Sequence, residues 1–202
     1  MMRLVIVLGV ATAVSACASG AGQRAGTGGA SGPASGGNLN TCVGTVQAAV
    51  SGARAVDDGA LLARAVAPAE QGKLCAAHVF EATEALTVYR VSQADRANRE
   101  PGRWWTFRRP EGTRERYRAD YVICAEWSAL DTWARCQLRV GARFVVGTGQ
   151  SVRCQDGSLI AQSAEEQVYI DNDAREGRVL VEHCEPLGAW PAASGAQSQS
   201  AQ

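Results

Sequence analysis

The sequence predicts an α+β domain in which N-terminal helices are followed by an antiparallel, β-rich region stabilised by disulfides. Two patterns support this class. Apolar residues between positions 43 and 85 recur at helical spacing, whereas after residue 86 short β-branched and aromatic runs alternate with Gly and Pro. Helices followed by a series of strands are typical of α+β folds.

Three helices are expected in the first part of the domain. Asp57 or Asp58 is a suitable cap for the second helix, which Pro68 would end. A third helix is expected over about 70–85. The first helix is predicted from valines at helical spacing: Val43, Val46 and Val50.

Strands are expected after residue 86, with a short charged helix over 110–118 and a tight turn at Gly141-Ala142. The segment Gly147-Thr148-Gly149 is expected to be a glycine-rich turn after a strand. The predicted strands cover residues 86–91, 104–107, 121–124, 137–140, 143–146, 167–170 and 179–183.

The first 16 residues predict export. A basic start, Met1-Met2-Arg3, precedes an apolar run that is too short to span a membrane but suits a signal peptide. The sequence Val14-Ser15-Ala16-Cys17 resembles the lipobox of bacterial lipoproteins. This resemblance implies cleavage before Cys17 and an anchor in the membrane through acyl chains on that residue. Ala18, rather than an aspartate, follows the cysteine, which favours the outer membrane. An ordinary secretory signal with an incidental Cys17 is the alternative.

Composition divides the remaining chain into three parts. Residues 17–41 are rich in Gly, Ala and Ser, which predicts a flexible linker after the lipidated cysteine. A single folded domain is expected over 42–190, and residues 191–202 form a polar tail that is expected to be disordered. The net charge of zero argues against nucleic acid as a partner.

Six cysteines remain after Cys17, an even number in a chain predicted to reach an oxidising compartment. Three disulfides are therefore expected, and 15 connectivities are possible. Sequential pairing is the simplest of these. A metal site is not expected, because the cysteines are widely spaced and the chain has only two histidines. The six are Cys42, Cys75, Cys124, Cys136, Cys154 and Cys184.

The region 86–171 carries a second resemblance. An aromatic-Arg pair at Tyr89-Arg90, a Trp-Thr pair at Trp105-Thr106 and the Glu-rich start of a late strand together resemble ADP-ribosyltransferase-like domains, including toxins that consume NAD. The resemblance implies that Arg90 holds NAD as a substrate and that Trp105 and Thr106 line the nicotinamide pocket. Glu165 or Glu166 would be the catalytic carboxylate, because a carboxylate can stabilise the oxocarbenium charge that forms at the ribose.

The chain departs from that family's pattern at one place. The family's motif ends in glutamate, whereas Glu165-Glu166-Gln167 has glutamine at the third position. A second function therefore stands beside the first: a non-catalytic envelope module that binds a protein or a cell-wall partner, with its aromatic residues as anchors.

Overall fold

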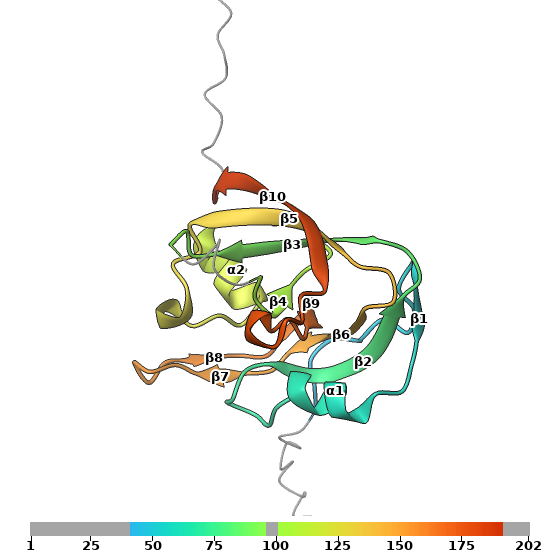
Figure 1. Ribbon diagram of the computed structural model, residues 1–202. Coiled ribbons are helices and arrows are strands. Elements are labelled where there is room, and N and C mark those ends of the chain that lie inside the picture. The colour runs from blue at the N-terminus through green and yellow to red at the C-terminus, as the bar shows by residue number, and fades with distance from the viewer. Residues whose placement is uncertain (1–40, 96–100, 192–202) are drawn as a thin grey trace, which may run out of the picture. The chain divides into compact units, whose positions relative to one another are not determined.

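A computed structural model describes residues 41–95 and 101–191 (Figure 1). The predicted signal peptide, Cys17, the linker up to residue 40 and the tail from residue 192 lie outside the described residues. Within the described ranges the named strands pair only in antiparallel fashion. They form two sheets and one small hairpin.

The larger sheet has the strand order β1-β2-β6-β9-β4, and the smaller sheet has the order β10-β5-β3. The hairpin of β7 and β8 projects from the sheets (Figure 1). The strands of the larger sheet are β1 (Ala53–Ala55), β2 (Leu74–Ala82), β6 (Arg143–Gly149), β9 (Ser163–Ile170) and β4 (Trp104–Trp105). The other strands are β3 (Leu86–Ser92), β5 (Thr132–Leu138), β10 (Val181–Ala189), β7 (Val152–Arg153) and β8 (Leu159–Ile160).

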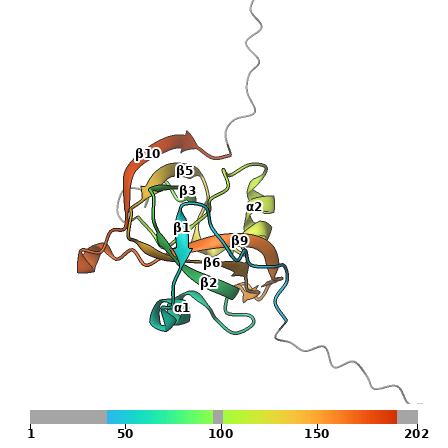
Figure 2. The same ribbon diagram turned by 90° about the vertical axis from the view of Figure 1, so that its right-hand side faces the viewer.

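The hydrophobic core lies between the two sheets. Phe144 and Val146 on β6 point into this core, and Val145 between them points to the outer face, as the alternation of a strand requires. The smaller sheet contributes Val88 and Leu138. Figure 2 shows β10, β5 and β3 at one end of the domain and α1 at the other.

The two sheets are joined along one side by the backbone. Tyr89 on β3 and Thr106, directly after β4, exchange two N–H···O hydrogen bonds of 2.8 and 2.9 Å. The strands therefore continue from the larger sheet into the smaller one at β4 and β3. Residues close to this junction are brought together from both sheets.

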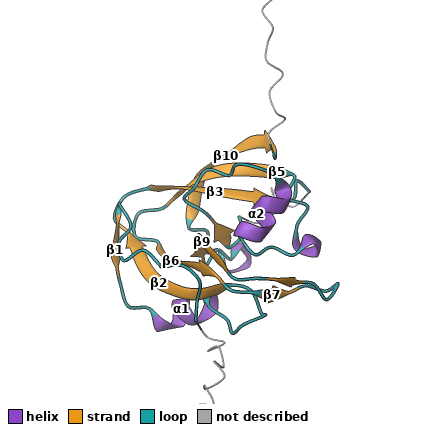
Figure 3. Ribbon diagram, turned by 180° about the vertical axis from the view of Figure 1, so that it is seen from behind, coloured by secondary structure: helices purple, strands orange, loops and turns teal. Residues whose placement is uncertain are grey.

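Two short α-helices occur in the described part of the chain, α1 (Gly59–Ala65) and α2 (Arg114–Asp120) (Figure 3). Each begins at a side-chain cap. Asp58 accepts a hydrogen bond of 2.9 Å from the backbone N–H of Leu61, and Thr113 accepts one of 3.2 Å from that of Arg116. Two 3₁₀ turns complete the structure, η1 (Ala125–Trp127) and η2 (Ala174–Glu176).

The predicted α+β class with N-terminal helices is wrong, because the domain is mostly antiparallel β. Of the three helices expected before residue 86, only the second is present, as α1. Residues 43–50 contain no helix: Cys42 is bonded to Cys75, and the backbone N–H of Gln47 donates to Glu166 at 2.7 Å. Residues 74–82 form β2. Pairing with β1 and β6 overrides the helical propensity of its alanines.

Several local predictions also need correction. Residues 121–124 form a turn after α2 rather than a strand, and the glycine-rich segment 147–149 belongs to β6. A Cβ on Gly147 would lie 2.2 Å from the carbonyl oxygen of Ala76, so this strand pair needs glycine for its close approach. The predicted turn at Gly141 is present, but it joins β5 to β6, which belong to different sheets.

Three disulfides are formed, and their pairing is not sequential. Only the Cys42–Cys75 bond agrees with the sequential pattern, and it ties the start of the domain to β2. The other two bonds are Cys124–Cys154 and Cys136–Cys184. Cys124–Cys154 joins the start of η1 to the β7–β8 hairpin, and Cys136–Cys184 links β5 to β10. No helix in the described residues is long and apolar enough to cross a membrane.

Candidate functional site

A cavity of about 280 Å³ lies beside the junction of β3 and β4. Arg90 and Trp105, two of the residues predicted to bind a cofactor, line it. Val88 on β3 faces the core between the sheets, and Arg90, two residues further on, is expected on the same side of the strand. Arg90 therefore extends from the core side of β3 and contributes to the cavity wall.

Gly102 holds the guanidinium of Arg90 in place. A Cβ on Gly102 would lie 2.1 Å from Cζ of Arg90, so the guanidinium packs directly on the glycine backbone. The carbonyl oxygen of Gly102 accepts hydrogen bonds from Nε1 of Trp105 at 3.1 Å and from Nδ2 of Asn172 at 2.7 Å. One residue without a side chain thus positions Arg90 and Trp105 together.

The polar turn that follows β9 holds Gly102 in position. Asp171 is buried and is contacted by the hydroxyl of Tyr169 at 3.0 Å and by Arg178 at 3.2 Å. Arg103 donates to the carbonyl oxygen of Asn172 at 3.1 Å. The sequence predicted a polar turn here, and the structure shows that the turn carries an ion-pair network, centred on the buried Asp171 and completed by partly exposed arginines, which supports the 102–105 segment.

The remaining predicted site residues lie elsewhere. Glu165, Glu166 and Thr106 line a separate hollow at the start of β9. Glu165 pairs with Arg108 at 2.5 Å, and Glu166 accepts two hydrogen bonds from Gln47. Thr106 is 1% exposed, and its hydroxyl lies 3.1 Å from that of Tyr121. The structure therefore does not bring the predicted carboxylates into the cavity that holds Arg90 and Trp105.

Aromatic side chains form much of the cavity wall. Tyr117 and Tyr121 come from α2 and its end, with ring centroids 4.4 Å apart. Burial raises the pKa of both phenols, so they are uncharged at neutral pH. Trp105 is 4% exposed and belongs both to the core and to the cavity lining, and Trp104 beside it packs edge-on against Tyr169 at 5.0 Å.

Trp127 is the exposed member of this aromatic group. It lies on η1, lines the cavity and remains 47% exposed to solvent. Its ring passes over Gly72, where an added Cβ would lie 3.2 Å from Cη2. A large exposed indole on a short, tethered turn is suited to contact a ligand that enters the cavity.

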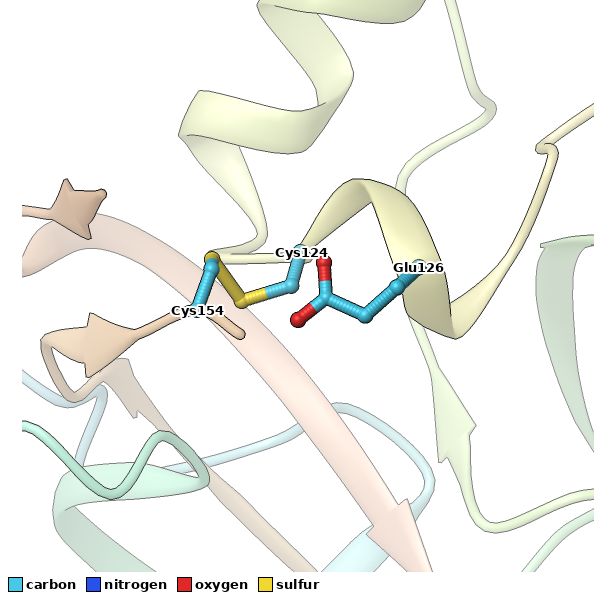
Figure 4. A group of neighbouring side chains, drawn as sticks. All are labelled: Cys124, Glu126 and Cys154. Atoms are coloured by element: carbon cyan, nitrogen blue, oxygen red, sulfur yellow. A yellow bond between two sulfur atoms is a disulfide. The ribbon is translucent and has the colours of Figure 1, made fainter. Parts of the chain in front are cut away.

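Figure 4 shows how the turn that carries Trp127 is tied down. The Cys124–Cys154 disulfide and the carboxylate of Glu126 form the one group of three potential metal-ligating side chains found among the described residues. The sulfur atoms are bonded to each other and are not thiolates, the form that binds metals. Glu126 accepts a hydrogen bond of 2.8 Å from the N–H of Gln155. This group is a structural tether between η1 and the hairpin.

Backbone strain is concentrated around the cavity. Five described non-glycine residues have positive φ, and three of them line the cavity: Lys73 at 65°, Val122 at 50° and Leu130 at 51°. The left-handed region is unfavourable for such residues, above all for a β-branched one, and each costs about 1–3 kcal/mol. Strained residues of this kind cluster at functional sites, so the strain marks the cavity as the candidate site.

The polar groups of the cavity are cationic or neutral. Arg90 and Lys73 carry positive charge, and no carboxylate, histidine or cysteine occurs among the described residues that line the cavity. The neutral polar side chains are amides and hydroxyls, from Gln71, Gln93, Gln167, Ser92 and Ser128. Such a wall can bind a ligand through stacking and hydrogen bonds, and its described residues offer no carboxylate or imidazole for acid–base catalysis.

Sequence reasoning missed several residues of this site, including Lys73, Gln71 and Tyr121. Gln71 and Lys73 fell inside a predicted helix, and Tyr121 inside a predicted strand. One signal could have indicated the region. Three of the five tryptophans of the chain fall between residues 104 and 127, within a segment rich in tyrosine.

Comparison with protein-family models, with curated proteins and with solved structures gave no match for this chain.

Proposed function

We propose that this protein is a lipid-anchored envelope module that binds a cell-wall glycan in the aromatic cavity. One observation carries the proposal: the strained cavity combines aromatic surfaces with amides and hydroxyls, and its described wall contains no carboxylate, histidine or cysteine. Sugars present an apolar C–H face and hydroxyls that both donate and accept hydrogen bonds, which this wall matches.

The size of the cavity favours a glycan over a protein surface. A volume of about 280 Å³ is close to the lower limit of small-ligand pockets and suits one ring. Protein partners usually need a much larger contact, with about 800 Å² buried on each side. A single ring can enter the cavity while the neighbouring units of the polymer extend past Trp127.

The positions of the residues predicted to consume NAD favour glycan binding over NAD consumption. Arg90 and Trp105 share the cavity, whereas Glu165 and Glu166 are engaged with Arg108 and Gln47 in another hollow. The activity implied by the resemblance stays a prediction, and the geometry favours the binding module.

Co-sedimentation with isolated cell-wall sacculi tests the proposal. The detergent-solubilised protein is expected to pellet with the sacculi. Trp127→Ala is expected to weaken this binding about tenfold, because it removes the exposed stacking surface. Leu159→Ala is the matched control, since Leu159 is also apolar and 52% exposed but does not line the cavity. Absence of pelleting by the unmodified protein, or equal loss in both variants, would contradict the proposal.

The anchor is tested separately by fractionation of cells. Cys17 is the proposed acyl carrier, so Cys17→Ser is expected to remove the protein from the outer-membrane fraction. Retention of the variant in that fraction, at the level of the unmodified protein, would argue against lipidation at Cys17.

A further inference from the structure

The exposed indole of Trp127 depends on its surroundings for a fixed position. It lies on η1, a single 3₁₀ turn of three residues, which a backbone hydrogen bond of 3.2 Å from the N–H of Trp127 to the carbonyl oxygen of Cys124 closes. A turn this short has poor hydrogen-bond geometry and little stability of its own. Groups outside the turn therefore decide where the indole lies at the cavity.

Arg118 on α2 holds this turn at both ends. Its Nη1 donates to the carbonyl oxygen of Cys124 at 3.1 Å, and its Nη2 donates to that of Ser128 at 2.6 Å. These two residues flank η1 directly, one before and one after it. A guanidinium presents its N–H groups in a fixed planar fork, so the two bonds set the positions of the two carbonyls relative to each other.

The surroundings of Arg118 indicate that these bonds are strong. Arg118 is partly buried, and this burial, together with the nearby charge of Arg114, lowers its pKa. An arginine stays protonated in a protein, so a partly desolvated guanidinium needs hydrogen-bond acceptors. Hydrogen bonds from a charged donor to a carbonyl oxygen are stronger than those between neutral groups.

The helix that carries Arg118 also forms part of the aromatic wall. Tyr117 precedes Arg118 on α2, Tyr121 follows the last residue of the helix, and both line the cavity. The ring of Tyr117 packs edge-on against the buried Trp190 at 4.9 Å, which holds α2 in place. Arg118 thus joins the exposed indole of Trp127 to the helix that carries the two phenols.

The contacts between η1 and the hairpin do not replace Arg118. The Cys124–Cys154 disulfide acts before the turn, and the N–H of Gln155 bonds the side chain of Glu126 within it. Among the described residues, Arg118 is the side chain that bonds the backbone on both sides of Trp127.

We infer that Arg118 is a positioning residue of the aromatic cavity. It acts through the backbone of η1 and fixes the indole of Trp127 where a glycan ring can stack on it. This inference rests on the proposed function, because it names the residue that prepares the same site for its ligand. A fixed stacking surface loses less conformational entropy when a ligand binds than a mobile one.

The mobility of the Trp127 indole in the free protein tests the inference first. NMR relaxation of the indole N–H groups is measured for the detergent-solubilised protein and its variants. Arg118→Gln is expected to increase the mobility of Trp127. Arg116→Gln is the matched control and is expected to leave it unchanged, because Arg116 lies on the same helix but pairs with Asp120 at 2.8 Å.

A lysine variant guards against a failure of Arg118→Gln to fold. Arg118→Lys keeps the positive charge but lacks the planar fork, so it is also expected to increase the mobility of the Trp127 indole. An indole that is as fixed in both Arg118 variants as in the unmodified protein would overturn the inference.

Co-sedimentation with sacculi then separates positioning from a general loss of stability. Arg118→Gln alone is expected to weaken binding about fivefold. In the Trp127→Ala background the same substitution is expected to weaken binding less than twofold, because the group that Arg118 positions is already absent. Equal effects of Arg118→Gln in the two backgrounds would overturn the inference and leave glycan binding in place.

The proposed function and this inference fail in different ways. If the unmodified protein does not bind sacculi, the proposed function is contradicted. An increase in Trp127 mobility in Arg118→Gln, but not in Arg116→Gln, would in that case still support the positioning of the indole by Arg118.

Discussion

Gly102 shows how a single position can control the candidate site. Its φ of +65° is readily adopted only by glycine, and its missing side chain makes room for the guanidinium of Arg90. The same residue accepts hydrogen bonds from Trp105 and Asn172. The local backbone conformation and the positions of Arg90 and Trp105 therefore depend on the same glycine.

Gly102→Ala is expected to separate binding from stability. The alanine is strained at this φ and lowers the free energy of unfolding by about 1 kcal/mol. Its Cβ also displaces the guanidinium of Arg90, so affinity for the wall glycan is expected to fall about tenfold. Thermal unfolding and calorimetry measure the two effects.

Gly177→Ala is the matched control for this substitution. Gly177 has a φ of +68° and nothing within 4 Å of an added Cβ, so it carries the same backbone penalty without a contact. Its affinity for the sugar is expected to remain unchanged. Equal affinities in the two alanine variants would show that Gly102 does not position Arg90.

Asp58 links the start of α1 to acid sensitivity. The hydrogen bond from the N–H of Leu61, with a smaller contribution from Arg143, holds the pKa of Asp58 below its ordinary value of 3.8. A carboxyl with a lowered pKa in the folded state stabilises the fold above its unfolded pKa, and this contribution is lost as pH falls through the folded value.

Asp58→Asn is therefore expected to have a pH-dependent effect. Asparagine still caps the helix but removes the ion pair with Arg143, so the variant is less stable than the unmodified protein at pH 7. The difference in melting temperature is expected to disappear as the pH falls well below 3.8. A constant difference from pH 7 down to pH 2 would contradict this role.

At the scale of the elements, the disulfides have different tasks. Cys124–Cys154 connects η1, which carries Trp127, to the hairpin, whereas Cys136–Cys184 connects two paired strands on the smaller sheet. Their cysteines are 30 and 48 residues apart in the sequence. Loss of either bond is therefore expected to raise the conformational entropy of the unfolded chain by a similar amount.

Replacing each pair with serines tests this division. Both double variants are expected to lose about 3–4 kcal/mol of stability. Only the Cys124→Ser/Cys154→Ser variant is expected to bind the sugar several-fold more weakly, because the turn with Trp127 is no longer tethered. The measurement compares denaturant unfolding with binding at low temperature. Weaker binding in both variants to the same extent would indicate a general effect of destabilisation.

The elements that the sequence predicted correctly are those with a clear local signal. Asp58 and Pro68 bracket α1, and the β-branched runs near Leu86 and Arg143 form β3 and β6. Residues 74–82 were misassigned because the spacing of their apolar residues also fits a helix, and only pairing with β1 and β6 makes the segment a strand. Such pairings are not visible in a local pattern.

At the scale of the molecule, the site could be predicted only in part. Arg90 and Trp105 were identified and do share a cavity, but their partners come from segments far apart in the chain. Lys73 reaches the cavity through β2 and the register of the larger sheet, and Gln167 through β9. The spacing of residues in the sequence does not show that Lys73 and Gln167 reach the same cavity. Their proximity depends on the strand order of the larger sheet, which was not predicted.

Binding of a wall glycan in the aromatic cavity can be followed through the indole N–H signals of the tryptophans. Trp104, Trp105 and Trp127 line the cavity, whereas Trp133 and Trp190 lie outside it. Titration with the disaccharide of N-acetylglucosamine and N-acetylmuramic acid is followed by NMR of the detergent-solubilised protein. Saturable shifts of the three cavity signals, with the other two unmoved, are predicted. Shifts confined to Trp133 and Trp190, or no shifts at millimolar disaccharide, would contradict the claim.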